Sequence, residues 1–93
     1  MVKQGAVCAD VVDGDTFDTR AGIRLRLARV YAPEIDTEEG KRAKGRLEML
    51  ILDKPITYEV VARDDWGSVV AEVWVNNVNV NDIMRSYGYA EPW

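Results

Sequence analysis

Apolar and polar residues alternate along several short stretches of this chain, which is the period of strands that bury one face. The first stretch covers residues 4–12, and its apolar positions on one face are Val7, Ala9 and Val11. An Asp-Gly pair follows at 13–14, and such a pair between alternating segments is the strongest short-range signal for a hairpin. We therefore expect a tight turn that leads into a second strand over 16–19.

A third strand is predicted over residues 23–31, where apolar residues alternate with arginines. The alternation slips toward its end, because Arg29 falls on the apolar register and Val30 on the polar one. A bulge, a barrel corner or the end of the strand would each produce this slip. Pro33 then stops the strand.

A helical period replaces the strand period after an acidic stretch. Apolar residues recur at helical spacing over roughly residues 38–52, at Ala43, Leu47, Leu50 and Ile51. Gly40 and Gly45 weaken this amphipathic helix by roughly 1 kcal/mol each relative to alanine. Packing against the rest of the chain must supply what helix propensity does not.

Two more strands and a short helix are predicted from Pro55 onward. The apolar faces of the two strands comprise Ile56, Tyr58, Val60 and Ala62, and then Val69, Ala71, Val73 and Val75. The hairpin between them has the sequence RDDWGS. The short helix is expected to run from Asn81, a suitable N-cap, to Tyr87, with Gly88 as its C-terminal stop.

The predicted order is therefore three strands, a helix, two strands and a helix. Five short strands with a helix after the third are typical of the five-stranded OB-fold Greek-key barrel, whose closure removes exposed strand edges. With 93 residues, of which 47% are hydrophobic, the chain has the size of one small domain with one core. We expect a single α+β domain over residues 1–93.

Composition narrows the available chemistry. The chain contains no histidine, so the commonest general base and the commonest metal ligand are missing. Cys8 is the only cysteine, which excludes disulfides within the chain and cysteine-rich zinc sites, and its apolar surroundings predict a buried thiol. Any catalysis must rely on carboxylates, arginines and oxygen-bound metal.

Charge and hydropathy limit the partners. The net charge of −4 argues against broad electrostatic binding of nucleic acid. Residues 1–46 carry nine Lys and Arg against eight acids, a balance of +1, whereas residues 47–93 carry three against eight, a balance of −5. No apolar run approaches the roughly 18 residues of a membrane span, and the start MVKQGAV lacks the apolar stretch of a secretion signal. We expect a cytoplasmic protein without membrane contact.

Four segments together resemble one known family. In chain order they are VVDGDT, RLRLARVYAPE, DDWG and VNVNDIMRSYGYA, and with these spacings they are similar to the staphylococcal nuclease (thermonuclease) family from about Val7 to Ala90. The resemblance implies an OB-fold barrel and calcium-dependent hydrolysis of phosphodiester bonds in DNA and RNA. Family members also continue past the position of Trp93 into an aromatic segment and a final helix.

The resemblance assigns roles to four residues of this sequence. It implies that Asp15 is a calcium ligand and that Arg26 holds the phosphate. Glu34 is implied as the base or water-orienting carboxylate, and the backbone carbonyl of Ala32 as a further metal ligand. Calcium takes oxygen ligands, and guanidinium groups pair with phosphate oxygens, so these residue types suit the chemistry.

Two positions depart from the family's pattern. Tyr31 stands where the family has a second metal-binding aspartate, and Ser68 stands where it has a second phosphate-binding arginine. A neutral phenol does not replace a carboxylate on calcium, and a hydroxyl brings no charge and no bidentate fork. We therefore expect cleavage to be weakened or lost, with weak binding of single-stranded DNA, RNA or nucleotides by a monomer.

Other interpretations of the same residues remain open. Asp13, Asp36 or Asp10 would restore a full nuclease by replacing the missing calcium ligand, although a turn role is the simpler interpretation of Asp13. In isolation Arg26 is a solvated strand residue, and Glu34 near a helix start favours the helix dipole. Tyr31, beside a phosphate-binding arginine, is placed to stack a base. The acidic second half favours an alternative function, a non-catalytic OB-fold binding or scaffold module for a protein partner.

Overall fold

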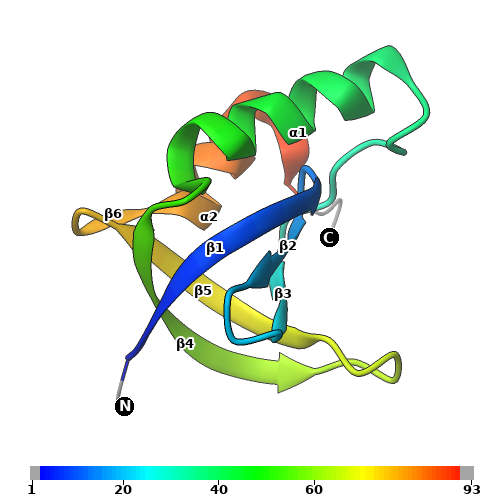
Figure 1. Ribbon diagram of the computed structural model, residues 1–93. Coiled ribbons are helices and arrows are strands. Elements are labelled where there is room, and N and C mark those ends of the chain that lie inside the picture. The colour runs from blue at the N-terminus through cyan, green and yellow to red at the C-terminus, as the bar shows by residue number, and fades with distance from the viewer. Residues whose placement is uncertain (1–2, 91–93) are drawn as a thin grey trace.

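The computed structural model describes residues 3–90 and forms a barrel with helices beside it (Figure 1). The strands are β1 (Gln4–Asp13), β2 (Thr16–Thr19), β3 (Arg24–Leu27), β4 (Pro55–Arg63), β5 (Val69–Val75) and the two-residue β6 (Val78–Asn79). Their order across the sheet is β3-β2-β1-β4-β5-β6. The sheet closes because β3 also pairs with β5 in parallel, with Leu25 opposite Val69 and Leu27 opposite Ala71.

This arrangement confirms the predicted fold class, a five-stranded barrel of α+β type with one helix after the third strand and a short C-terminal helix. The barrel is mixed, since the closing β3–β5 pair is parallel and the other ladders are antiparallel. The first helix is α1 (Glu38–Ile51), and the second region comprises α2 (Val80–Met84) followed by the wide turn η1 (Arg85–Tyr89). None of the helices within residues 3–90 is long and apolar enough to span a bilayer.

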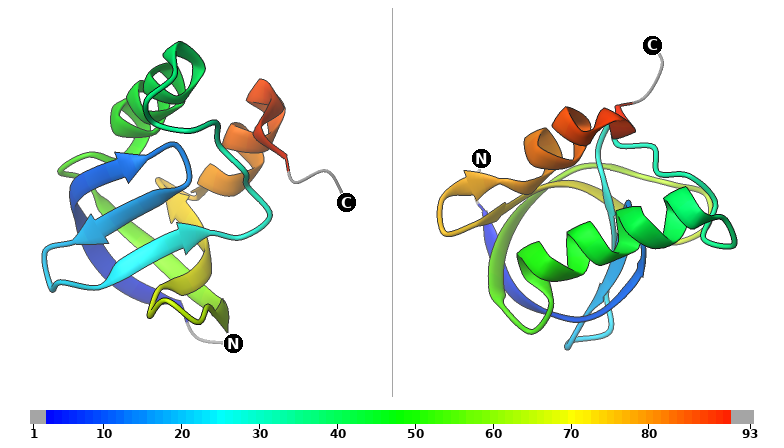
Figure 2. Two further views of the ribbon diagram at one scale, coloured as in Figure 1. Left: turned by 90° about the vertical axis from the view of Figure 1, so that its right-hand side faces the viewer. Right: turned by 90° about the horizontal axis from the view of Figure 1, so that it is seen from above.

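Helix α1 lies across one end of the barrel (Figure 2). Its buried face consists of Gly40, Ala43, Leu47 and Ile51, spaced at three and four residues as an amphipathic helix requires. This face belongs to one core cluster with buried strand residues that include Phe17, Leu27 and Val73. The core therefore joins the helix to strands from both halves of the chain, and this packing holds α1 despite its two glycines.

Register shifts in β1 and β4 change which side chains face the core. In β1 the register shifts between Cys8 and Asp10 and again between Val11 and Asp13. As a result Cys8 and Val11 are buried while Ala9 is exposed, so the predicted face of Val7, Ala9 and Val11 is wrong. The predicted burial of the Cys8 thiol is confirmed. In β4 a similar shift after Val60 turns Ala62 outward, which corrects its predicted inward face.

Two helix and strand ends also differ from the sequence prediction. The third strand ends at Leu27, and Arg29 has a left-handed backbone with φ of 57°, so the slip in alternation marks the end of the strand. The N-cap of α2 is Asn79, whose side chain accepts from the Asp82 N–H, not Asn81. Gly88 has φ of 97° and ends the helical conformation as predicted.

Candidate active site

A pair of carboxylates lies in the turn between β1 and β2. Asp15 is buried, and its Oδ2 accepts from the Ala32 N–H at 3.1 Å while its Oδ1 accepts from the Thr16 hydroxyl at 2.7 Å. The first of these bonds joins residues that are far apart in the chain. It fixes the segment around Ala32 beside the turn, so the structure brings these two sequence-predicted residues together.

Asp13 belongs to the same centre. Its Oδ1 accepts from the Asp15 N–H at 3.0 Å. Burial, followed by the neighbouring Asp15 carboxyl, raises the pKa of Asp13 from its ordinary 3.8 to about 6. The turn therefore concentrates negative charge that the surrounding protein compensates incompletely, and the Asp-Gly-Asp spacing was the sequence signal for it.

Gly14, between the two carboxylates, explains why the turn can approach its neighbours closely. A Cβ atom at this position would lie 2.5 Å from the Ala43 Cβ of α1 and 2.8 Å from the Ala32 Cβ. Real Cβ atoms do not come that close, so only glycine fits. Three small residues thus hold the carboxylate turn, the helix and the Ala32 segment together.

Glu34 is exposed, and its backbone is fixed by the start of α1. The Glu34 carbonyl accepts from the backbone N–H of Thr37 at 3.0 Å and from its hydroxyl at 2.7 Å. Thr37 also caps α1 by accepting from the Gly40 N–H at 3.0 Å. At Gly40 a Cβ would lie 1.8 Å from the Glu34 carbonyl oxygen, so this glycine allows the Glu34 backbone to pack on the helix.

Arg26 comes to the site through strand pairing. It lies opposite Thr16 across the β2–β3 ladder, next to Asp15, and the Leu27 N–H donates to the Asp15 carbonyl at 2.8 Å. Arg24, on the same outward face, is engaged elsewhere, because its guanidinium donates two hydrogen bonds to Asp18 at 2.8 and 3.1 Å. Of these two arginines, Arg26 is the one beside the carboxylate turn.

The two altered family positions lie in two other segments of the chain. Tyr31 precedes Ala32, is 56% exposed, and donates its backbone N–H to the Tyr89 carbonyl at 2.7 Å. Ser68 lies in the β4–β5 hairpin, where its N–H donates to the Asp64 carboxylate at 2.8 Å. Ser68 directly precedes Val69, the partner of Leu25 in β3. Position 68 is therefore next to the start of β5, which pairs with the strand that carries Arg24 and Arg26.

The donor set of this centre suits a hard divalent cation. Asp13 and Asp15 supply carboxylate oxygens, burial and the neighbouring carboxyl raise the pKa of Asp13, and the Ala32 backbone is held against Asp15. Calcium takes six to eight oxygen ligands, including water. Within residues 3–90 no three Asp, Glu, His or Cys side chains come close enough together to hold a metal, so neither Asp10 nor Asp36 completes the pair.

Comparison with known proteins matches this sequence to one family. The family described as "Staphylococcal nuclease homologue" matches residues 24–92. An "Uncharacterized endonuclease" of Escherichia coli is 32% identical over 95 residues, which cover 90% of this chain and 62% of that protein. The Escherichia coli "Protein ParB" is 30% identical over 69 residues, covering 71% of this chain and 39% of that protein.

A plant relative shows the same similarity. The "Probable staphylococcal-like nuclease CAN2" of Oryza sativa subsp. japonica is 30% identical over 67 residues, covering 72% of this chain and 18% of that protein. The chain therefore spans less than two thirds of the length of these curated relatives. The matched family region contains Arg26, Glu34 and the barrel-closing strands. This chain belongs to the staphylococcal nuclease homologue family.

Proposed function

We propose that this domain hydrolyses phosphodiester bonds in single-stranded DNA or RNA with the help of calcium, at a rate well below that of a complete site. The observation that supports it is the pair of carboxylates, Asp13 and Asp15, held against Ala32 with Arg26 on the adjacent strand. Two relatives carry names that include "endonuclease" or "nuclease", which supports the reaction class.

The chemistry requires relief of negative charge. A phosphodiester is anionic and gains further charge on its oxygens as water attacks, so cationic groups aimed at those oxygens lower the barrier. Asp15, with Asp13 and the Ala32 carbonyl, would hold the calcium, which supplies charge neutralisation at the phosphate. Arg26 donates to the phosphate oxygens, and Glu34 orients the attacking water and accepts its proton.

The proposed low rate follows from the two altered positions. Tyr31 contributes no carboxylate to the metal, and Ser68 contributes no guanidinium to the phosphate. Loss of one preorganised donor typically costs about 10² to 10³ in rate, and an arginine that stabilises phosphoryl transfer is worth about 10³ to 10⁵. Because groups in one site act together, the two losses do not simply multiply. Binding of nucleic acid or nucleotides survives both changes better than cleavage does.

The first test is cleavage of labelled single-stranded DNA and RNA with calcium and with chelator. Glu34→Ala, a change at an exposed side chain, serves as the control for contaminating nucleases. Cleavage that needs both calcium and Glu34 supports the proposal. Absence of both cleavage and oligonucleotide binding at low salt would refute it and favour the scaffold alternative, because phosphate contacts are strongest at low ionic strength.

A second test restores the altered groups. Tyr31→Asp and Ser68→Arg together should raise the cleavage rate more than the product of the two single effects, since both groups act on one transition state. Tyr31→Asn is the matched control, because it has the shape of aspartate without the charge. A double variant no faster than the parent would show that the low rate has another cause.

A further inference from the structure

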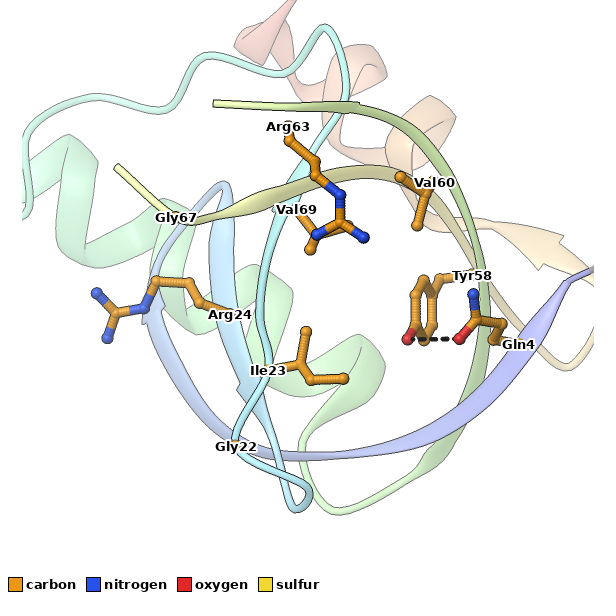
Figure 3. A pocket seen from close by; sticks show the side chains of 9 residues that line it. All are labelled: Gln4, Gly22, Ile23, Arg24, Tyr58, Val60, Arg63, Gly67 and Val69. Carbon is orange, nitrogen blue, oxygen red and sulfur yellow. Dashed lines mark hydrogen bonds between the residues drawn. The ribbon is translucent and has the colours of Figure 1, made fainter. Parts of the chain in front are cut away.

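The barrel has an opening at the end away from α1, and this opening leads into a cavity of about 360 Å³ (Figure 3). Its lining is mixed: the side chains of Ile23, Val60, Val69 and the ring of Tyr58 lie beside the polar side chains of Gln4, Arg24 and Arg63. This volume lies in the range of pockets that hold small molecules. None of the residues assigned to phosphodiester cleavage lines the cavity, so a ligand here would occupy a separate site.

An arginine points into this opening because of the bulge in β4. Val60 pairs with Ala71 and faces inward, and strict alternation would then turn Arg63 outward. The register shift after Val60 instead pairs Arg63 with Val69, whose side chain is buried. Paired residues share a face, and Figure 3 shows the Arg63 guanidinium reaching over the cavity. Bulges often redirect a side chain in this way at functional sites.

The opening offers hydrogen-bond donors and positive charge without a carboxylate. No acidic side chain lines the cavity, and Arg63 has no carboxylate partner within the described range of residues 3–90. The nearby Asp64 carboxylate instead accepts from the backbone N–H groups of Trp66 and Ser68.

A second donor belongs to the same rim. The Oε1 of Gln4 accepts from the Tyr58 hydroxyl at 3.1 Å, which leaves the amide NH₂ of Gln4 as a donor. Arg24, also at the rim, directs its guanidinium away from the cavity toward Asp18 (Figure 3). The positive character of the opening therefore comes from Arg63.

We propose that this cavity binds a small organic anion, in which a carboxylate, sulfonate or phosphate is carried by an aromatic or other apolar group. The anionic group pairs with Arg63 and the Gln4 amide, and the apolar part packs against Ile23, Tyr58 and Val69. In a chain with a net charge of −4, an arginine over a cavity that has apolar side chains on its wall and no acids selects for this combination. Charge alone or apolar surface alone satisfies only half of the site.

The probe for the test is anilinonaphthalene sulfonate, an aromatic anion whose fluorescence reports binding. We expect Arg63→Gln to weaken its binding at least about tenfold, as loss of a charge-assisted hydrogen bond predicts. Arg29→Gln is the matched control, because it removes the same charge from an exposed arginine paired with Glu72 outside the cavity. Equal binding by the parent and Arg63→Gln, or equal weakening in both variants, would overturn the proposal.

A pair of substitutions at Ile23 separates charge from apolar contact. Ile23 is 38% exposed at the opening, so both variants should fold. Ile23→Gln and Ile23→Glu remove similar apolar area, but only the glutamate places a negative charge beside Arg63. The glutamate variant should bind the probe several-fold more weakly than the glutamine variant. Identical binding by the two would contradict an anion on Arg63.

Competition identifies which part of the ligand matters. Benzoate should displace the probe, and inorganic phosphate at the same concentration should not, because phosphate lacks the apolar part. Displacement by phosphate as effective as by benzoate would refute the apolar contact. The cleavage rate of Arg63→Gln should equal that of the parent, which keeps this result distinct from failure of the proposed nuclease function.

Discussion

The two glycines of α1 should respond to alanine in opposite directions. Helix propensity alone predicts a gain of about 1 kcal/mol at each position. Gly45 has no atom within 4 Å of its added Cβ, so Gly45→Ala should realise that gain. At Gly40 the added Cβ would lie 1.8 Å from the Glu34 carbonyl oxygen and 2.5 Å from its carbon. The Glu34 backbone would have to move away by more than an ångström.

The magnitude at Gly40 follows from what that movement breaks. Overpacking costs about 1–3 kcal/mol, and the two hydrogen bonds from Thr37 to the Glu34 carbonyl contribute about 0.5–1.5 kcal/mol each. After the propensity gain is subtracted, Gly40→Ala should lower the free energy of unfolding by about 3 kcal/mol. For a domain of this size that is a fall in Tm of about 12–24 °C, against a rise of about 4–8 °C for Gly45→Ala.

Urea and thermal unfolding followed by circular dichroism measure both effects. Below the lowered Tm, Gly40→Ala should also cleave nucleic acid more slowly than the parent, because the Glu34 backbone is displaced. Gly45→Ala should leave cleavage unchanged. If the two variants shifted stability in the same direction, the close approach of the Glu34 backbone to Gly40 would be wrong.

Three further predictions concern the pKa of Asp13, the hydrogen bonds of Asn81 and the burial of Cys8. Asp13→Asn keeps the acceptor for the Asp15 N–H, and in chelator it should raise the free energy of unfolding by about 1 kcal/mol at pH 8 and by nothing at pH 4. The sign follows because the folded-state pKa of Asp13, about 6, exceeds the ordinary 3.8, so the parent loses stability as pH rises through this window. Urea midpoints at the two pH values measure the effect. An equal gain in stability at both pH values would contradict the raised pKa of Asp13. Asn81→Leu should cost about 3 kcal/mol, because it leaves the buried N–H of Val73 without a partner and removes one of the hydrogen bonds to each of the carbonyls of Ala28 and Ala71. Asn79→Ala should cost about 1 kcal/mol as a lost N-cap, and equal urea midpoints for the two variants would show that the buried network carries no extra weight. Cys8 is fully buried, and burial raises its pKa to about 11, so a disulfide reagent should label it at pH 8 only at the rate of unfolding; rapid labelling of the native protein would refute its burial.

Local patterns were sufficient where the fold obeys a regular period. In β5, every second residue from Val69 to Val75 is buried, and α1 buries positions three and four apart. The Asp-Gly pair correctly predicted the first hairpin. These features depend on neighbours in sequence, which is why alternation and turn chemistry identify them.

The remaining features depend on residues distant in sequence. The bulges in β1 and β4 are set by pairing with other strands, so alternation assigned Ala9 and Ala62 to the wrong face. Asn81 resembles a helix cap locally, but its amide satisfies backbone groups of Val73 and of the segments around Ala28 and Ala71.

The candidate site also combines features that the sequence predicts with features that need the folded structure. Asp15, Arg26 and Glu34 came from family resemblance, and their roles stay predictions. The pKa of Asp13 is raised because the closed barrel buries its carboxyl. The close approach of Gly14 to Ala32 and Ala43 also exists only in the closed barrel. Neither can be computed from composition or spacing, because each needs the helix and the turn to be in place.

The segment around Tyr31, which faces the carboxylate turn, is held in place by residues 89–90. Tyr31 donates its N–H to the Tyr89 carbonyl, and Val30 forms a β-bridge with Ala90. During synthesis the ribosome therefore releases Asp13 and Asp15 long before the residues that secure the opposite wall. A nascent chain carries the carboxylates without the anchored segment, and a protease that removes Tyr89 and Ala90 returns the finished protein to that state.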